Sequence, residues 1–147
     1  MHFTSDVVVE RSQRQVAEFF AEPANLAKWD RSVVQVIPTS AGPVGVGFTF
    51  DTIAPSGLRM SYRITEHMHD TGSSIALERS PAFRTAVWQM SYETVPAGTR
   101  IRCEVTFTLR PRYWLLHIPL LLTQRRALRR DLTLLKEAIE THEGAAG

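Results

Sequence analysis

Residues 33–110 alternate between apolar and polar side chains, and this period of two residues constrains the fold more than any other feature of the chain. The alternation is clearest over 101–110, where apolar residues take turns with charged or hydroxylated ones, and 58–65 repeats it. A strand with this pattern buries one face and exposes the other to water. The stretch therefore predicts an antiparallel sheet with a single apolar face.

Short turn sequences divide this stretch into six predicted strands. Each turn is rich in the small, proline and aspartate residues that favour sharp changes of direction. The turns lie at 41–43, 54–57, 70–72, 80–81 and 96–98. Because connections of this length leave no room for a crossover, consecutive strands are expected to be antiparallel neighbours.

A further strand and two short helices precede the sheet region. The run of three valines ending at Val9 predicts a strand over 3–10. Ser12 is a suitable N-cap for a helix with apolar residues at helical spacing. Pro23 ends that helix and begins a second short one, which closes at Trp29.

One long helix follows the sheet region, after an irregular segment at 111–118. Pro119 suits the first helical position, and the apolar periodicity runs to about His142. The apolar stripe consists of Leu121, Leu128, Leu132, Leu135 and Ile139, and the opposite side carries Arg126, Arg130, Glu137 and Glu140. Since no other helix is long enough to cover the sheet, we predict an α+β fold in which six to seven curved antiparallel strands wrap around this helix.

A single helix can fill only part of the concave side of a strongly curved sheet, so the remainder is either a cavity or collapsed side chains. The inward positions are rich in aromatic residues and methionine, which suit apolar ligand sites. On the sheet they are Phe48, Phe50, Met60, Tyr62, Leu77, Trp88, Met90 and Tyr92, and Trp29, Leu121, Arg125 and Leu128 are expected to border the same space. The alternative is that these side chains simply fill the core.

Composition predicts one globular domain over 1–147, with 144–147 as a loose tail. The net charge is only +2, and the pI of about 9.0 reflects fifteen arginines against two lysines, spread along the chain in a way that does not favour nucleic acid. The N-terminus lacks the pattern of an export signal, which makes the cytoplasm the expected location. The apolar run 114–122 is too short to cross a bilayer.

Short motifs along almost the whole chain form an ordered set. They are Val8-Val9-Glu10, Val16, Phe19, Glu22-Pro23, Asn25-Leu26, Trp29, Gly98-Thr99-Arg100 and the segment 134–140. This set resembles the SRPBCC (START-like) superfamily, and most closely its polyketide cyclase/dehydrase branch. The resemblance implies a helix-grip fold around a deep hydrophobic cavity that takes up a lipid, polyketide, plant hormone or sterol, with cyclisation or dehydration in some members. It places Trp29 near the cavity mouth and 111–118 as the loop into the gripping helix, and it selects no catalytic set.

Few polar residues are candidates for chemistry inside the cavity. Tyr62, Tyr92 and Glu66 share the inward parity, and such groups can act as acid and base in an enolisation or dehydration, although structural tyrosines are the alternative. Arg125 lies one turn from the apolar stripe. Its guanidinium either holds an acidic oxygen of a ligand or reaches solvent while its stem covers apolar surface.

Two further patterns involve metal-binding or nucleophilic residue types. His67 and His69 could begin a metal site, but a third ligand is missing and the strand parity turns both imidazoles to solvent, so no metal is expected. Cys103 has buried parity and is expected to behave as a small hydrophobe. His117 is the only plausible partner that could activate its thiol.

The arginines at 125, 126, 129 and 130 are either the solvated side of the last helix or, with Trp114, Leu115 and Leu116 beside them, a docking surface for an anionic membrane. The preferred interpretation of the whole chain is a helix-grip protein that binds a hydrophobic small molecule without cofactor, metal or nucleic acid. The alternatives are a cyclase or dehydratase that uses the same cavity, and a partner-binding module with a filled core.

Overall fold

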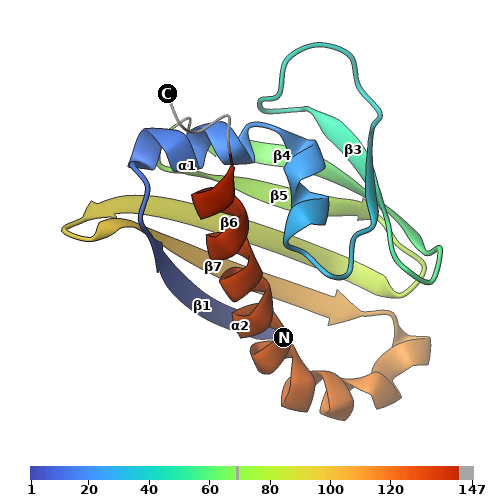
Figure 1. Cartoon of the computed structure of the whole chain (residues 1–147). Coiled ribbons are helices and arrows are strands. Elements are labelled where there is room, and N and C mark those ends of the chain that lie inside the picture. Colours follow the sequence, from blue (N-terminus) through green and yellow to red (C-terminus); the bar gives the residue numbers. More distant parts are fainter. Residues whose placement is uncertain (69, 143–147) are drawn as a thin grey trace.

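The computed structural model describes residues 1–68 and 70–142. In chain order the elements are β1 (His2–Val9), α1 (Gln13–Phe20), η1 (Pro23–Lys28), β2 (Gln35–Pro38), β3 (Thr49–Ile53), β4 (Arg59–Met68), β5 (Gly72–Arg79), β6 (Phe83–Val95), β7 (Gly98–Leu109), η2 (Pro111–Leu116) and α2 (His117–Thr141) (Figure 1). The elements η1 and η2 are 3₁₀-helices. The predicted loose tail at 144–147 lies outside the described residues.

The seven strands of the described residues form one antiparallel sheet in the order β1-β7-β6-β5-β4-β3-β2. Strands β2 to β7 are each paired with the next along the chain, as the short turns predict, and β1 adds to the free edge of β7. Figure 1 shows the sheet curving around α2, with α1 and η1 closing one end of the concave side. This arrangement confirms the predicted helix-grip fold.

Local capping stabilises the start of α1, directly after β1. The Ser12 hydroxyl accepts a hydrogen bond from the Gln15 backbone N–H at 3.2 Å, and the Gln15 side chain accepts one from the Ser12 N–H at 3.0 Å. This reciprocal capping box satisfies two N–H groups that the first turn of α1 would otherwise leave unpaired. The buried Asn25 amide then donates to the Phe19 carbonyl at 2.8 Å, which fixes η1 against the end of α1.

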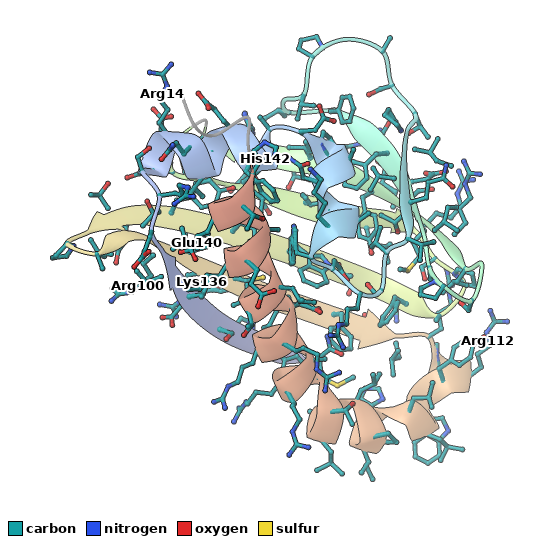
Figure 2. The ribbon with its side chains drawn as sticks, in the orientation of Figure 1. Arg14, Arg100, Arg112, Lys136, Glu140 and His142 are labelled. Carbon is teal, nitrogen blue, oxygen red and sulfur yellow. The ribbon has the colours of Figure 1, made fainter. Side chains whose placement is uncertain are left out.

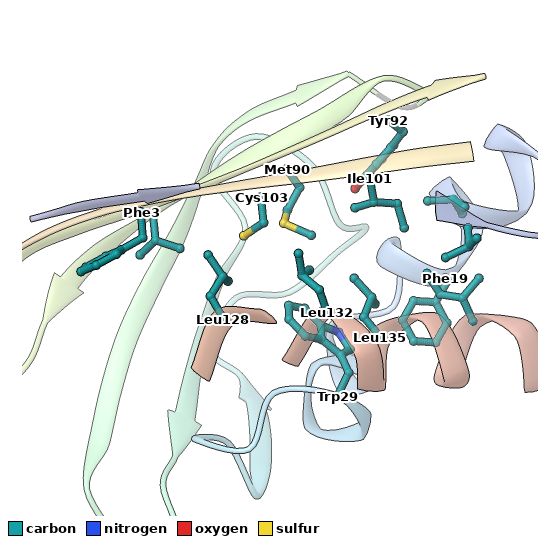
Figure 3. Packing of buried hydrophobic residues seen from close by; sticks show 14 of the residues in the cluster. Phe3, Phe19, Trp29, Met90, Tyr92, Ile101, Cys103, Leu128, Leu132 and Leu135 are labelled. Atoms are coloured by element: carbon teal, nitrogen blue, oxygen red, sulfur yellow. The ribbon is translucent and has the colours of Figure 1, made fainter. Parts of the chain in front are cut away.

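The C-terminal two thirds of α2 supply the helical half of the core. Leu128, Leu132, Leu135 and Ile139 are each at most 2% exposed, and Figure 3 shows the first three directed at Met90, Ile101 and Cys103 on the sheet. Burying a leucine side chain stabilises a fold by about 1.5–3 kcal/mol. The Lys136 ammonium donates to the Val8 carbonyl at 3.0 Å and pairs with Glu140 at 2.7 Å, so this half of α2 is also tied to β1.

The N-terminal part of α2 differs from the prediction. The helix begins at His117, two residues before Pro119, and the preceding segment forms η2 instead of a loop. Leu121 was predicted to belong to the buried stripe, but it is 53% exposed because the first turns of α2 extend past the sheet (Figure 1). Within residues 1–68 and 70–142, no helix has the length and hydropathy needed to span a membrane.

Candidate functional site

A cavity of about 440 Å³ lies between the concave face of the sheet, α2 and the segment 29–33. Its wall is mostly apolar. The lining includes Trp29 and Val33 from the segment after η1, Phe50 from β3, Met60, Tyr62 and Ile64 from β4, Ile75 from β5, Ala86, Trp88 and Met90 from β6, and Val105 and Phe107 from β7. Small-molecule sites in proteins typically enclose about 300–1,000 Å³ and are lined mainly by apolar and aromatic groups.

Half of the residues predicted to border the cavity do line it. These are Trp29, Phe50, Met60, Tyr62, Trp88 and Met90. They come from four segments that are distant in the sequence, and period-two counting was sufficient to orient those on the strands. The Phe50 and Tyr62 rings stack with centroids 5.7 Å apart on adjacent strands, which gives one wall of the cavity a continuous aromatic surface.

Four other predicted residues pack in the core outside the cavity. Phe48 belongs to a separate small cluster beside β3 and β4, and Leu77 and Leu128 pack into the main core. Tyr92 is only 5% exposed and stacks on Phe20 with centroids 5.1 Å apart, so Phe20 takes the place in the cavity wall that was assigned to Tyr92. The three sheet positions among them have the inward parity, but the curved sheet offers more inward surface than the cavity uses.

The structure places Leu121, Arg125 and Glu66 on the surface, which corrects their predicted inward positions. The face of α2 that lines the cavity is instead Gln124, Ala127, Arg130 and Asp131. This face is rotated from the leucine stripe, because Leu128 and Leu132 point at β6 and β7 while the cavity lies toward β3 and β4. Helical periodicity identifies an apolar stripe, and it does not specify which neighbouring face borders an unfilled space.

His67 lines the cavity, whereas the strand parity had turned it to solvent. The reason is a β-bulge in β4: Ile64 pairs with Ile75, but Glu66 pairs with Ser74, so one additional residue lies between the two pairs. A bulge reverses the parity of the residues that follow it. Glu66 is therefore exposed and His67 faces inward, opposite Ser73. The second histidine of the predicted pattern, His69, lies outside the described residues.

Two carboxyl groups in the cavity wall form its most unusual electrostatic feature. Asp30 is 6% exposed, and its Oδ1 accepts hydrogen bonds from the Ser32 backbone N–H at 2.9 Å and the Ser32 hydroxyl at 2.6 Å. Desolvation by burial nevertheless raises the pKa of Asp30, because these bonds compensate only in part. Asp131, on α2, faces the same region of the cavity.

Burial and the neighbouring charge of Asp30 together raise the pKa of Asp131 to about 6. A hydrogen bond from the Arg31 backbone and the charges of Arg31 and Arg130 act in the opposite direction. Because the charge of Asp30 disfavours ionisation of Asp131, the titrations of the two carboxyl groups are coupled, and both pKa values lie above the ordinary range. Sequence reasoning missed this pair because Asp30 and Asp131 are far apart in the chain and each looks like an ordinary polar residue.

Tyr62 adds a hydroxyl group to the same wall. Desolvation and the nearby charge of Asp30 raise its pKa, so the phenol stays protonated and can donate a hydrogen bond to a ligand. Its hydroxyl contacts the Met60 sulfur at 3.9 Å. Burial also raises the pKa of Tyr92, but this tyrosine bonds to Ser73 and is not part of the cavity lining.

The structure gives no support to a nucleophilic cysteine. Cys103, on β7, is fully buried in the main core, and burial, followed by the charges of nearby carboxylates, raises the pKa of its thiol to about 12. His117 lies at the start of α2, where its ring bonds to the Trp114 carbonyl at 3.0 Å. In the part of the chain that the structure describes, no three histidine, cysteine or acidic side chains are arranged to hold a metal ion.

A curved antiparallel sheet that closes on one long helix and leaves an apolar cavity between them defines the helix-grip class of proteins. Sequence comparison assigns the family within this class. The polyketide cyclase/dehydrase and lipid transport family matches residues 1–140, and the chain belongs to this family. A search of curated proteins gives no significant match.

Solved structures show the same fold at low sequence identity. The Thermus thermophilus protein TTHA0849 is similar with a TM-score of 0.81 and 13% identity, over 97% of this chain and 99% of that one. Ara h 8.0201 gives a TM-score of 0.71 and 10% identity, over 95% and 97% of the two chains. The di-domain ARO/CYC StfQ from the steffimycin biosynthetic pathway gives 0.74 and 13%, over 97% of this chain and 51% of that one.

Proposed function

We propose that the protein binds an apolar small molecule, of lipid or polyketide type, in the cavity between the sheet and α2. The observation that supports this most directly is the cavity itself, because about 440 Å³ lined mainly by aromatic, methionine and aliphatic side chains would bind an apolar ligand by removing its surface from water. Tyr62, Asp30 and Asp131 would orient polar groups of the ligand at one side.

The cavity volume weighs against the alternative of a partner-binding module with a filled core. Native mass spectrometry of the protein from its host offers the first test, since a retained apolar ligand is the expected result. A tightly filled, ligand-free protein that binds no apolar compound would contradict the proposal. The cytoplasmic location inferred from the sequence remains a prediction.

Titration with N-phenyl-1-naphthylamine, a neutral apolar fluorophore, tests the position of the site. Ala127→Phe places a ring in the cavity from α2 and is expected to weaken binding about ten-fold or more, because apolar contacts and space are lost together. Ala97→Phe, at the exposed tip of the β6–β7 hairpin, is the matched control and should bind as the unaltered chain does. Equal binding by both variants would place the site elsewhere.

A second candidate function, catalysis of cyclisation or dehydration in the same cavity, is favoured by the carboxyl pair. Both reactions need a base that removes a proton from carbon and an acid, which protonates the attacked carbonyl oxygen in a cyclisation and the leaving hydroxyl in a dehydration. Asp30 and Asp131 have raised pKa values in a partly dry cavity, and Tyr62 supplies a third proton donor. StfQ, a structural neighbour, is described as an ARO/CYC protein of a biosynthetic pathway.

The two candidates separate in a turnover assay with a linear poly-β-ketone. An enzyme gives a cyclised or dehydrated product, and Asp30→Asn and Asp131→Asn lower its rate by about 100-fold while apolar probe binding persists. A pure carrier binds the compound and releases it unchanged. If both variants retain the full rate, the carboxyl pair takes no part in the chemistry.

A further inference from the structure

Six large apolar side chains are exposed at one end of the molecule, and together they form what we term the apolar patch. They are Trp114, Leu115 and Leu116 of η2 and Ile118, Leu121 and Leu122 of α2, with exposed fractions between 46% and 75%. Isolated exposed leucines are normal on protein surfaces, but six large apolar side chains exposed within residues 114–122 are far more than a typical surface segment carries.

The patch is exposed because η2 and the first turns of α2 extend beyond the sheet (Figure 1). Leu120 is the residue of this segment that packs on the main core, and it directs its neighbours Leu121 and Leu122 outward. The segment is held in place by Arg110, whose side chain donates to the Ser80 carbonyl at 3.0 Å, and by Arg112, which donates to the Pro81 carbonyl at 2.9 Å. The apolar side chains are thus displayed on an anchored element.

The surface next to the patch is basic. Residues 111–130 contain five arginines and no acidic residue. Arg125, Arg126 and Arg129 are exposed on the turns of α2 that follow the patch, and Figure 2 shows the side chains of this part of the helix extending away from the sheet. Ile118, Leu122, Arg125 and Arg129 recur at helical spacing, so one outward face of α2 changes from apolar to basic along its length.

An anionic lipid bilayer matches this arrangement best. Leucine, isoleucine and tryptophan side chains would insert at the boundary between headgroups and acyl chains, while arginines of the next turns would reach the phosphate layer with their stems on apolar surface. A second copy of the chain fits less well. Two patches packed face to face would bring two sets of arginines together without an acidic partner in the same segment.

We propose that the protein docks on anionic membranes through the apolar patch and the adjacent arginines. Docking in this orientation would bring the bilayer within one or two helical turns of Gln124 and Ala127, which line the cavity. An apolar ligand would then pass between membrane and cavity with little exposure to water. The docking itself does not depend on which ligand the cavity binds, so it can be tested on the purified chain alone.

Co-sedimentation with vesicles tests the proposal. The chain is expected to bind vesicles that mix phosphatidylglycerol with phosphatidylcholine at least about ten-fold more tightly than vesicles of phosphatidylcholine alone, and to lose this preference at high salt. The double variant L115S/L122S is expected to lower binding about ten-fold through lost insertion, and R125Q/R129Q to remove most of the preference for phosphatidylglycerol. Each replaced side chain is exposed, so folding should persist, as circular dichroism would check.

Matched variants on other surfaces serve as controls. V46S/M68S replaces two equally exposed apolar residues, and R14Q/R100Q replaces two exposed arginines remote from the patch (Figure 2); both should bind as the unaltered chain does. Patch and control variants that bind alike would overturn the proposal. So would a dimer that ignores vesicles and becomes monomeric in L115S/L122S, because the patch would then be a contact between copies.

Discussion

Asp30 illustrates how burial changes the chemistry of one residue. It follows Trp29 at the end of η1, and the turn to Val33 places its carboxyl group in the cavity wall under the Ser32 hydroxyl. Withdrawal from water favours its neutral form, and its charge in turn disfavours ionisation of Asp131 and Tyr62. The proton affinity of this part of the cavity therefore depends on three side chains together.

Asp30→Asn tests this coupling directly. Removing the like charge is expected to lower the pKa of Asp131 from about 6, and burial should keep it above the ordinary value of 3.8. Carboxyl carbon chemical shifts followed by NMR across the pH range would measure the change. The isosteric Glu78→Gln, at an exposed position of β5, is a control that should leave the pKa of Asp131 unchanged. If the pKa of Asp131 is also unchanged in the Asp30 variant, the two carboxyl groups do not interact.

The raised pKa of Asp131 should make the free energy of unfolding depend on pH. Its pKa is about 6 in the folded chain and 3.8 in the unfolded one, so between these values the folded state binds more protons. The contribution of Asp131 to the free energy of unfolding is therefore greatest below about pH 4 and falls as the pH rises to about 6. Urea titrations should show a shallower decline across this window for Asp131→Asn, and an identical pH profile would contradict the assignment.

At the scale of elements, the β6–β7 hairpin contains a position, Gly98, that only glycine can occupy without strain. Gly98 has φ +142°, and a Cβ atom there would lie 2.1 Å from the Val9 carbonyl oxygen on β1. A close approach of backbone to backbone cannot relax by moving a side chain. Gly98 ends the turn after Ala97, and it also allows β1 to approach and pair with β7. One glycine therefore serves both the turn and the strand pairing.

Gly98→Ala is accordingly expected to destabilise the fold by about 2–4 kcal/mol. The control is Gly57→Ala in the β3–β4 turn, where φ is +85° but no atom lies within 4 Å of the added Cβ, and where only the left-handed backbone costs about 1–2 kcal/mol. Chemical denaturation measures both. Equal losses of unfolding free energy in the two variants would mean that the cost at Gly98 comes from backbone conformation alone, without a contribution from the contact to Val9.

The two parts of helix α2 lie in different environments. Its C-terminal part packs against the sheet, and its first turns extend beyond the sheet into solvent. Leu135→Ala, at 0% exposure, is expected to cost about 2–5 kcal/mol of unfolding free energy through lost burial and a cavity. Leu122→Ala, at 75% exposure, should change it by less than about 0.5 kcal/mol, and thermal unfolding of the pair measures the contrast.

At the scale of the whole molecule, the cavity exists because the sheet is longer than the helix can cover. Leu128 to Ile139 pack α2 against β1, β6 and β7, while the opposite half of the sheet, β3 and β4, borders the cavity. That space is closed by η1, the segment 29–33, Val44 and the face of α2 that carries Gln124 and Ala127. The cavity borders both the main core and the smaller cluster of Phe48, Phe50 and Ile64. An apolar ligand would fill the space next to both clusters, so binding and stability should be linked.

An apolar ligand is expected to raise the melting temperature by roughly 5–10 °C at a hundred times its dissociation constant, which corresponds to about 2.7 kcal/mol. Differential scanning calorimetry with a series of fatty acids and aromatic polyketides would measure the shift. At the same ligand concentration Ala127→Phe should reduce the shift to about half or less, because binding weakened ten-fold or more leaves at most about 1.4 kcal/mol, and Ala97→Phe should retain it, since only the first position borders the cavity. A shift in both variants would indicate binding at the surface.

The sequence by itself determined the seven strands, their antiparallel order from β2 to β7, the capped first helix and the long last helix. These features follow from local signals: period-two alternation, turn residues and helical spacing act within about ten residues and are read directly from the chain. The same signals orient Met60, Tyr62, Trp88 and Met90 toward the concave face, where the structure also has them, because no additional residue interrupts the alternation of β4 before Ile64 or of β6 around Trp88 and Met90.

The tertiary structure alone decided the rest of the site. The bulge that turns His67 inward depends on how β4 pairs with β5, and the choice of Gln124 and Ala127 over Leu121 and Arg125 depends on where α2 crosses the sheet. Asp30 and Asp131 share one region of the wall only because the segment after η1 and the helix α2 meet at the cavity, far apart in the chain. Local patterns specify which face of an element is apolar, whereas the distance between elements, and hence the position of a cavity and its charges, arises from packing among all of them.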